Sequence, residues 1–117
     1  MPPSRDGRIR TAGRRDGGTA MRMTRQYLVG ELSRLLAELR IAAEDDPPSA
    51  RAMAALRRTA ELLPPAALGP VVRRAVAVGD EVCRRSLERG DAATFRSQAA
   101  ALHHVHEFGV CSGLIED

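Results

Sequence analysis

The sequence contains no lysine, no tryptophan and few aromatic side chains, and these absences restrict how it can fold. Aromatic residues make up 3% of the 117 residues and hydrophobic residues 44%, so leucine, valine and alanine must build the core. Such cores are typical of helices packed on helices. All basic residues are arginine, which in a chain rich in alanine, glycine and proline indicates GC-rich codon usage rather than selection for guanidinium chemistry.

Cysteine and long apolar runs are also scarce. The two cysteines, Cys83 and Cys111, are far apart in sequence, which favours reduced thiols inside a cell over a disulfide scaffold. No apolar run is long enough to span a membrane, and no signal-peptide core is present. We therefore expect a cytoplasmic protein without membrane association.

Four segments show helical periodicity, separated by proline and glycine. They predict an all-α fold, a small antiparallel four-helix bundle with helices at about 24–43, 48–63, 70–89 and 91–108 in one domain, 23–117. The first helix is the clearest, because its leucines and a final alanine share one face. These inward residues are Leu28, Leu32, Leu35, Leu36, Leu39 and Ala43.

The second and third helices have narrower apolar stripes. The second carries Met53, Leu56, Ala60 and Leu63. The third is predicted to continue unbroken through Gly79, where small residues four positions apart let another helix approach closely. Its expected inner face consists of Val72, Ala75, Val76, Gly79, Cys83, Ser86 and Leu87. The arginine pairs of this helix are interleaved with Glu81 and Glu88, which predicts an ion-paired, solvated face rather than a phosphate-binding stripe.

The last helix holds all three histidines. Asp91 is its expected N-cap, and Gly109 is its expected left-handed end. A rotation of about 100° per residue places Phe95, Ala99, Leu102 and His106 inward. His104 points to solvent, and His103 lies one turn from Glu107 on the flank. After this helix, 110–117 either covers the end of the bundle with Leu114 and Ile115 or reaches a second subunit.

A metal site is one hypothesis for the histidine cluster. Its candidate ligands for zinc or another transition metal are His103, His106, Glu107 and Cys111, which would make the protein a metal- or thiol-responsive sensor. The sequence H-H-V-H-E lacks the H-E-x-x-H order that places two histidines and a general base on one helical face, and no C-x-x-C accompanies it. We therefore expect no cofactor, with His106 at the edge of the core and two histidines on the surface.

The first 22 residues form a separate, basic segment. Up to Arg25 the chain has seven arginines against two aspartates, and the rest has eleven arginines against thirteen acids. Glycine, proline and arginine dominate 1–22, so we expect disorder. A nucleic-acid contact would use its arginines: Arg5, Arg8, Arg10, Arg14 and Arg15. No aromatic side chain there can stack on a base, and Met21 or Met23 offers an alternative start, so we expect a dispensable leader instead.

No catalytic pattern accompanies these helices. The sequence has no glycine-rich phosphate loop and no nucleophile elbow. Its acidic clusters, 44–46 and 116–117, are expected to be exposed and unperturbed. We predict a non-catalytic interaction or regulatory module rather than an enzyme. Because modest apolar stripes leave the core thin, we expect a homodimer or a helical protein partner, and no nucleic acid.

Overall fold

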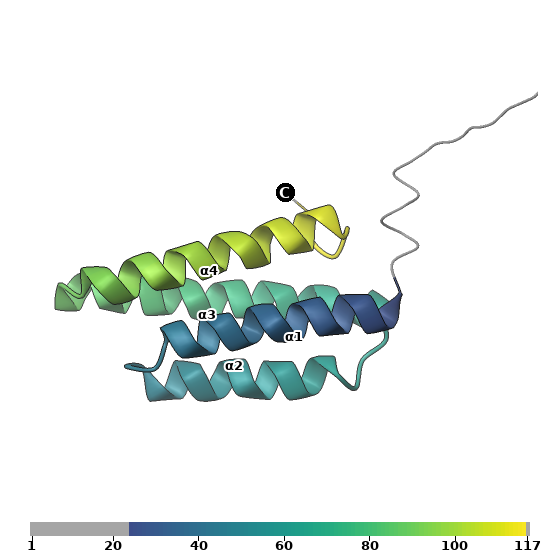
Figure 1. Ribbon diagram of the computed structural model, residues 1–117, viewed down its shortest axis with the longest axis horizontal. Coiled ribbons are helices and arrows are strands. Elements are labelled where there is room, and N and C mark those ends of the chain that lie inside the picture. Colours follow the sequence, from purple (N-terminus) through teal and green to yellow (C-terminus); the bar gives the residue numbers. More distant parts are fainter. Residues whose placement is uncertain (1–23, 117) are drawn as a thin grey trace, which may run out of the picture.

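The structure is a computed structural model that describes residues 24–116 and confirms the predicted fold class (Figure 1). Its helices are α1 (Arg25–Ala42), α2 (Pro47–Ala60), α3 (Leu68–Arg89) and α4 (Ala92–Cys111), with the 3₁₀ turn η2 (Pro65–Ala67) before α3. Each helix packs against its neighbours in sequence, and α1 also packs against α4. The bundle is therefore a closed ring of four helices, and the described residues contain no strand.

Helix α1 follows its sequence pattern closely. Thr24 is the N-cap, and its Oγ1 accepts a hydrogen bond from the Tyr27 backbone N–H at 3.0 Å. The Arg25 side chain donates hydrogen bonds to the carbonyls of Glu61 and Leu63, which fixes the start of α1 to the linker after α2. The predicted core face is confirmed, with Leu28, Leu32, Leu35, Leu36, Leu39 and Ala43 all buried.

Proline sets the limits of α2 and α3. Helix α2 begins at Pro47 and ends at Ala60, three residues before the predicted end. The residue before Pro64 is disfavoured in helical geometry, so the chain leaves α2 through turn hydrogen bonds instead. Helix α3 begins at Leu68, two residues earlier than predicted, because Pro70 falls in its first turn, where no N–H is needed.

Helix α3 crosses α4 closely at Gly79, and the predicted unbroken helix is confirmed there. A Cβ atom added to Gly79 would lie 2.5 Å from Leu102 Cδ2. The predicted inner face is wrong at its edge, because Val78 and Val82 are buried whereas Leu87 is 60% exposed. The helix is thus rotated from the predicted phase toward these two valines.

Substitution of Gly79 tests this close crossing. We expect Gly79→Ala to lower the free energy of unfolding by about 1–2 kcal/mol, because overpacking against Leu102 outweighs the better helix propensity of alanine. The control is Gly30→Ala on α1. A Cβ at Gly30 meets nothing within 4 Å, so this change should stabilise by about 0.5–1 kcal/mol. Urea denaturation measures both, and equal stabilisation by the two changes would contradict the close crossing.

Helix α4 is rotated relative to its predicted phase. Its buried residues are Gln98, Ala101, Val105 and Gly109. The predicted inward stripe is therefore right only in part: Leu102 packs against the core, Phe95 and Ala99 are half-buried, and His106 is exposed. Alanines lie on every side of this helix and give the hydrophobic pattern little direction. The fully buried Gln98 donates from Nε2 to the Leu39 carbonyl at 3.4 Å. Glutamine is mostly exposed in proteins, so Gln98 gave no sign that this face of α4 points into the core.

The C-terminal end folds back onto the bundle. The predicted helix end at Gly109 is wrong: α4 continues to Cys111, and Gly113 adopts the left-handed conformation with φ 77°. A Cβ on the buried Gly109 would lie 2.8 Å from Ile115 and 2.9 Å from Val72. The backbone N–H groups of Leu114 and Ile115 donate to the Gly109 carbonyl. Of the two predicted roles for this segment, the structure shows coverage of the bundle end.

Candidate functional site

A hollow of about 680 Å³ lies along the junction of the first and last helices, α1 and α4. The small side chains of α4 leave space between the two helices, and the floor of this space is apolar. The residues of this floor are Ile41, Ala42, Ala93, Ala100 and Ala101. Ile41 is 62% exposed, so a large aliphatic side chain in this hollow is open to solvent.

A second hollow of about 320 Å³ continues toward the start of α1. Tyr27, Leu35 and Phe108 supply its apolar surface, and His104 borders both hollows. The residues of the two hollows follow one another along both helices. We call the two hollows together the acidic groove.

Carboxylates dominate the rim of the acidic groove. Six of them line it: Glu31, Glu38, Glu44, Asp45, Asp91 and Glu107. Asp91 is also the confirmed N-cap of α4, and its hydrogen bonds from Thr94 hold the pKa of its carboxyl group below the usual range. This carboxylate therefore stays charged at neutral pH. An apolar floor is thus framed by concentrated negative charge.

One arginine lines the acidic groove, and it is already engaged. Arg34 lies 2.6 Å from a carboxylate oxygen of Glu31 and 2.6 Å from one of Glu38. The hydrogen bond from Arg34 lowers the pKa of Glu31 below its usual range. The six carboxylates and one guanidinium among the lining residues sum to a formal charge of −5. Arg89, which does not line the groove, pairs with Asp91 at 3.5 Å. Its field favours cationic partners.

The structure brings together only part of the proposed metal cluster. His103 Nε2 lies 3.7 Å from Glu107 Oε2, as the one-turn spacing predicted. Glu107 and Cys111 line the acidic groove, whereas His106 lines a separate hollow with Arg73. Within residues 24–116, no group of three or more histidine, cysteine or acidic side chains is placed to hold a metal ion.

The two cysteines occupy different environments. Burial, helped by the charge of Asp80, raises the pKa of the Cys83 thiol, which makes it a weak nucleophile. Cys111 was predicted to lie just past a helix end, but it is the last residue of α4 and is exposed. Both thiols are free.

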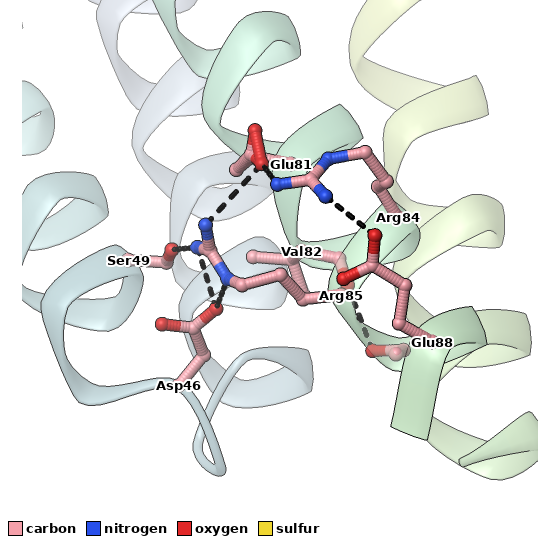
Figure 2. Close-up of polar contacts among 8 residues, drawn as sticks. Asp46, Ser49, Glu81, Val82, Arg84, Arg85 and Glu88 are labelled. Atoms are coloured by element: carbon pink, nitrogen blue, oxygen red, sulfur yellow. Dashed lines mark hydrogen bonds and ion pairs between the residues drawn. The ribbon is translucent and has the colours of Figure 1, made fainter. Parts of the chain in front are cut away.

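Sequence reasoning missed a polar cluster between α2 and α3 (Figure 2). Asp46, expected to be exposed, is only 8% exposed. Arg85 reaches from α3 and donates from Nε to Asp46 Oδ2 and from Nη2 to Ser49 Oγ, each at 2.9 Å. Glu81 lies 3.4 Å from another nitrogen of the same guanidinium. The position of Asp46 before two helix-starting prolines was the available signal, but its partner lies 39 residues away.

The Asp46–Arg85 pair makes stability depend on pH. Burial alone would raise the pKa of Asp46, but the hydrogen bond and charge of Arg85 outweigh burial and hold this pKa below its ordinary value of 3.8. A lowered pKa in the folded state stabilises the protein above about pH 4, and this contribution is lost as pH falls through the folded pKa.

Asp46→Asn tests this linkage. We expect a loss of about 1 kcal/mol at pH 7, a modest value because Arg85 is about one-third exposed. The variant should also lose less stability than the unchanged protein as pH falls below about 4. Asp45→Asn, at the exposed neighbouring position, is the control. Thermal unfolding across pH measures both, and identical pH profiles for the two variants would contradict the assignment.

The α3 surface carries the predicted ion pairs. Arg84 bonds to Glu81 and Glu88, and Arg85 pairs with Glu81 as well as with Asp46. The arginines proposed for nucleic acid, 5, 8, 10, 14 and 15, lie outside the described residues.

No protein-family model, curated protein or solved structure matches this chain. Among residues 24–116, no helix combines the length and apolar character needed to cross a membrane. The fold and the groove together define the class of protein: an all-α four-helix bundle with an acidic, apolar-floored groove between its first and last helices.

Proposed function

We propose that this protein is a non-catalytic cytoplasmic interaction module, and that its acidic groove binds a basic, amphipathic segment of a protein partner. The observation that carries the proposal is the combination of an open apolar floor with six carboxylates on its rim. Amphipathic helices commonly dock their apolar face into grooves of this kind. Basic residues flanking that face would lie beside the rim carboxylates.

The floor and the rim have different roles in the proposed docking. Ile41 is more than half exposed, and covering an isoleucine side chain fully is worth about 1.5–3 kcal/mol. Rim carboxylates in contact with water contribute less affinity each, but they steer a cationic partner and exclude an anionic one. The floor thus supplies binding energy, and the rim supplies selectivity.

The length of the groove sets the size of the partner segment. Helix α1 has 18 residues and lines the groove along its length, so the groove follows about 27 Å of helix. A partner helix of about five turns covers this length. A segment of this size presents at least about five apolar side chains to the floor, one or more per turn.

The test uses a fluorescein-labelled synthetic peptide of about 18 residues, built from leucine, arginine and alanine at amphipathic spacing. Fluorescence anisotropy with the full chain should show binding, and a version with glutamate in place of arginine should not bind. Ile41→Asp should weaken binding at least about tenfold, since a charge replaces the apolar anchor. Leu62→Asp, at an 83% exposed position on the linker after α2, is the matched control.

The acidic peptide and the Leu62→Asp control distinguish binding in the groove from nonspecific binding. If the acidic and basic peptides bind equally, the rim has no role. If Ile41→Asp and Leu62→Asp weaken binding equally, the floor is not the docking surface. Either result contradicts the proposed function.

A further inference from the structure

We propose that the chain's own arginine-rich segment, residues 1–22, occupies the acidic groove in the free protein and that a partner must displace it. This inference rests on the proposed function, because it takes the acidic groove to be the docking surface. It gives the groove a built-in competitor and makes partner binding conditional on release of this segment.

Charge complementarity is the first argument. Residues 1–22 contain six arginines and two aspartates, a formal charge of +4, and the groove carries −5. The outer face of α2 has the opposite character. That helix contains three exposed arginines and no acidic residue, so it repels a cationic segment: Arg51, Arg57 and Arg58. Of these two surfaces, the acidic groove is the complementary one.

The point of attachment is the second argument. The segment joins the bundle at Thr24, one turn before Tyr27, which lines the near end of the groove. The 23 residues before Thr24 can span up to about 75 Å, whereas the groove follows about 27 Å of α1. The segment therefore reaches every part of the groove. A tether of this length also gives an effective concentration on the order of millimolar, so pairing with a submillimolar dissociation constant is enough to fill most of the groove.

The composition of the segment matches both parts of the groove. Between Met1 and Met21, Ile9 is its one sizeable apolar residue, and it lies between Arg8 and Arg10. An isoleucine flanked by two arginines offers one side chain to the apolar floor beside Ile41 and two cations to the rim. The sequence alone suggested that residues 1–22 are a dispensable leader. The acidic groove provides a complementary surface for them.

Paramagnetic relaxation in the full chain tests the contact. A nitroxide is attached at Ser4→Cys, with Cys83→Ser and Cys111→Ser to remove the native thiols. We expect the amide signals of Ala42 and Ala100, in the groove, to lose most of their intensity. The amide of Ala55, on the exposed face of α2, is the control and should keep its intensity. The loss should disappear in about 0.5 M salt and in Glu44→Lys/Asp45→Lys, because both weaken the rim field.

A second measurement keeps this inference separate from the proposed function. Replacing Arg8, Arg10, Arg14 and Arg15 with serine should tighten binding of the basic peptide about fivefold, because the competitor is removed. If the peptide binds in the groove but the nitroxide leaves Ala42 and Ala100 unaffected, the inference fails and the proposed function stands. If the peptide does not bind and the nitroxide leaves these signals unaffected, the inference and the proposed function both fail. Signal loss only when labelled and unlabelled chains are mixed would overturn the inference in favour of docking on a second copy.

Discussion

Replacing Leu36 with alanine is expected to lower the free energy of unfolding by about 2–5 kcal/mol. Leu36 is fully buried in the middle of α1 and belongs to the main core cluster. The substitution removes apolar contacts and leaves a cavity that neighbouring helices fill only in part. A single domain of this size is stable by roughly 5–15 kcal/mol, so the loss is a large fraction of the total. Chemical denaturation by urea, followed by circular dichroism, measures it.

The control lies on the same helix. Ile41→Ala also shortens an aliphatic side chain, but Ile41 is 62% exposed, so stability should change by less than about 0.5 kcal/mol. The two substitutions together distinguish the core face of α1 from its groove face. A comparable loss of stability in both would contradict the placement of Ile41 on the exposed groove face of α1 rather than in the core.

Reversing two charges on the rim together is expected to weaken binding of a basic peptide about as much as Ile41→Asp does. In Glu44→Lys/Asp45→Lys, two exposed carboxylates at the end of α1 become cations, which repel a basic peptide from the larger hollow. We expect the dissociation constant of the arginine and leucine peptide to rise by at least about tenfold at low salt, or 1.4 kcal/mol. The difference should shrink as salt is added, because these charges are in contact with water.

The matched control is Asp80→Lys/Glu88→Lys on α3. It changes the net charge by the same amount, at exposed positions that do not line the acidic groove. If affinity depends on the position of the charges, the control should change it much less than the rim variant does. Equal weakening by both pairs would mean that the peptide responds to net charge alone, and the rim would have no specific role.

The sequence predicted helix number, order and approximate limits because strong local signals set them. Leucine spacing predicted the inward face of α1, and Asp91 marked the start of α4. Each of these signals acts within one or two turns. The single-helix interpretation of α3 was also correct, because its apolar pattern continues in register through Gly79.

The rotation of α4 and the polar cluster at Asp46 depend on residues distant in sequence. Alanines on several sides of α4 leave its inward face to be chosen by packing, and packing buries Gln98 rather than His106. Asp46 is buried because Arg85 approaches from another helix. The acidic groove was missed for the same reason. Its rim residues look like ordinary surface charges until α1 and α4 are placed side by side.

The two helices that form the acidic groove, α1 and α4, are also synthesised at different times. Helix α1 ends at Ala42 and α4 begins at Ala92, so a ribosome working at about 5–20 residues per second makes the second wall several seconds after the first. During synthesis Ile41 is exposed without the opposing alanines of α4. A nascent chain therefore has no finished groove, and the proposed docking requires a protein whose four helices have all been made.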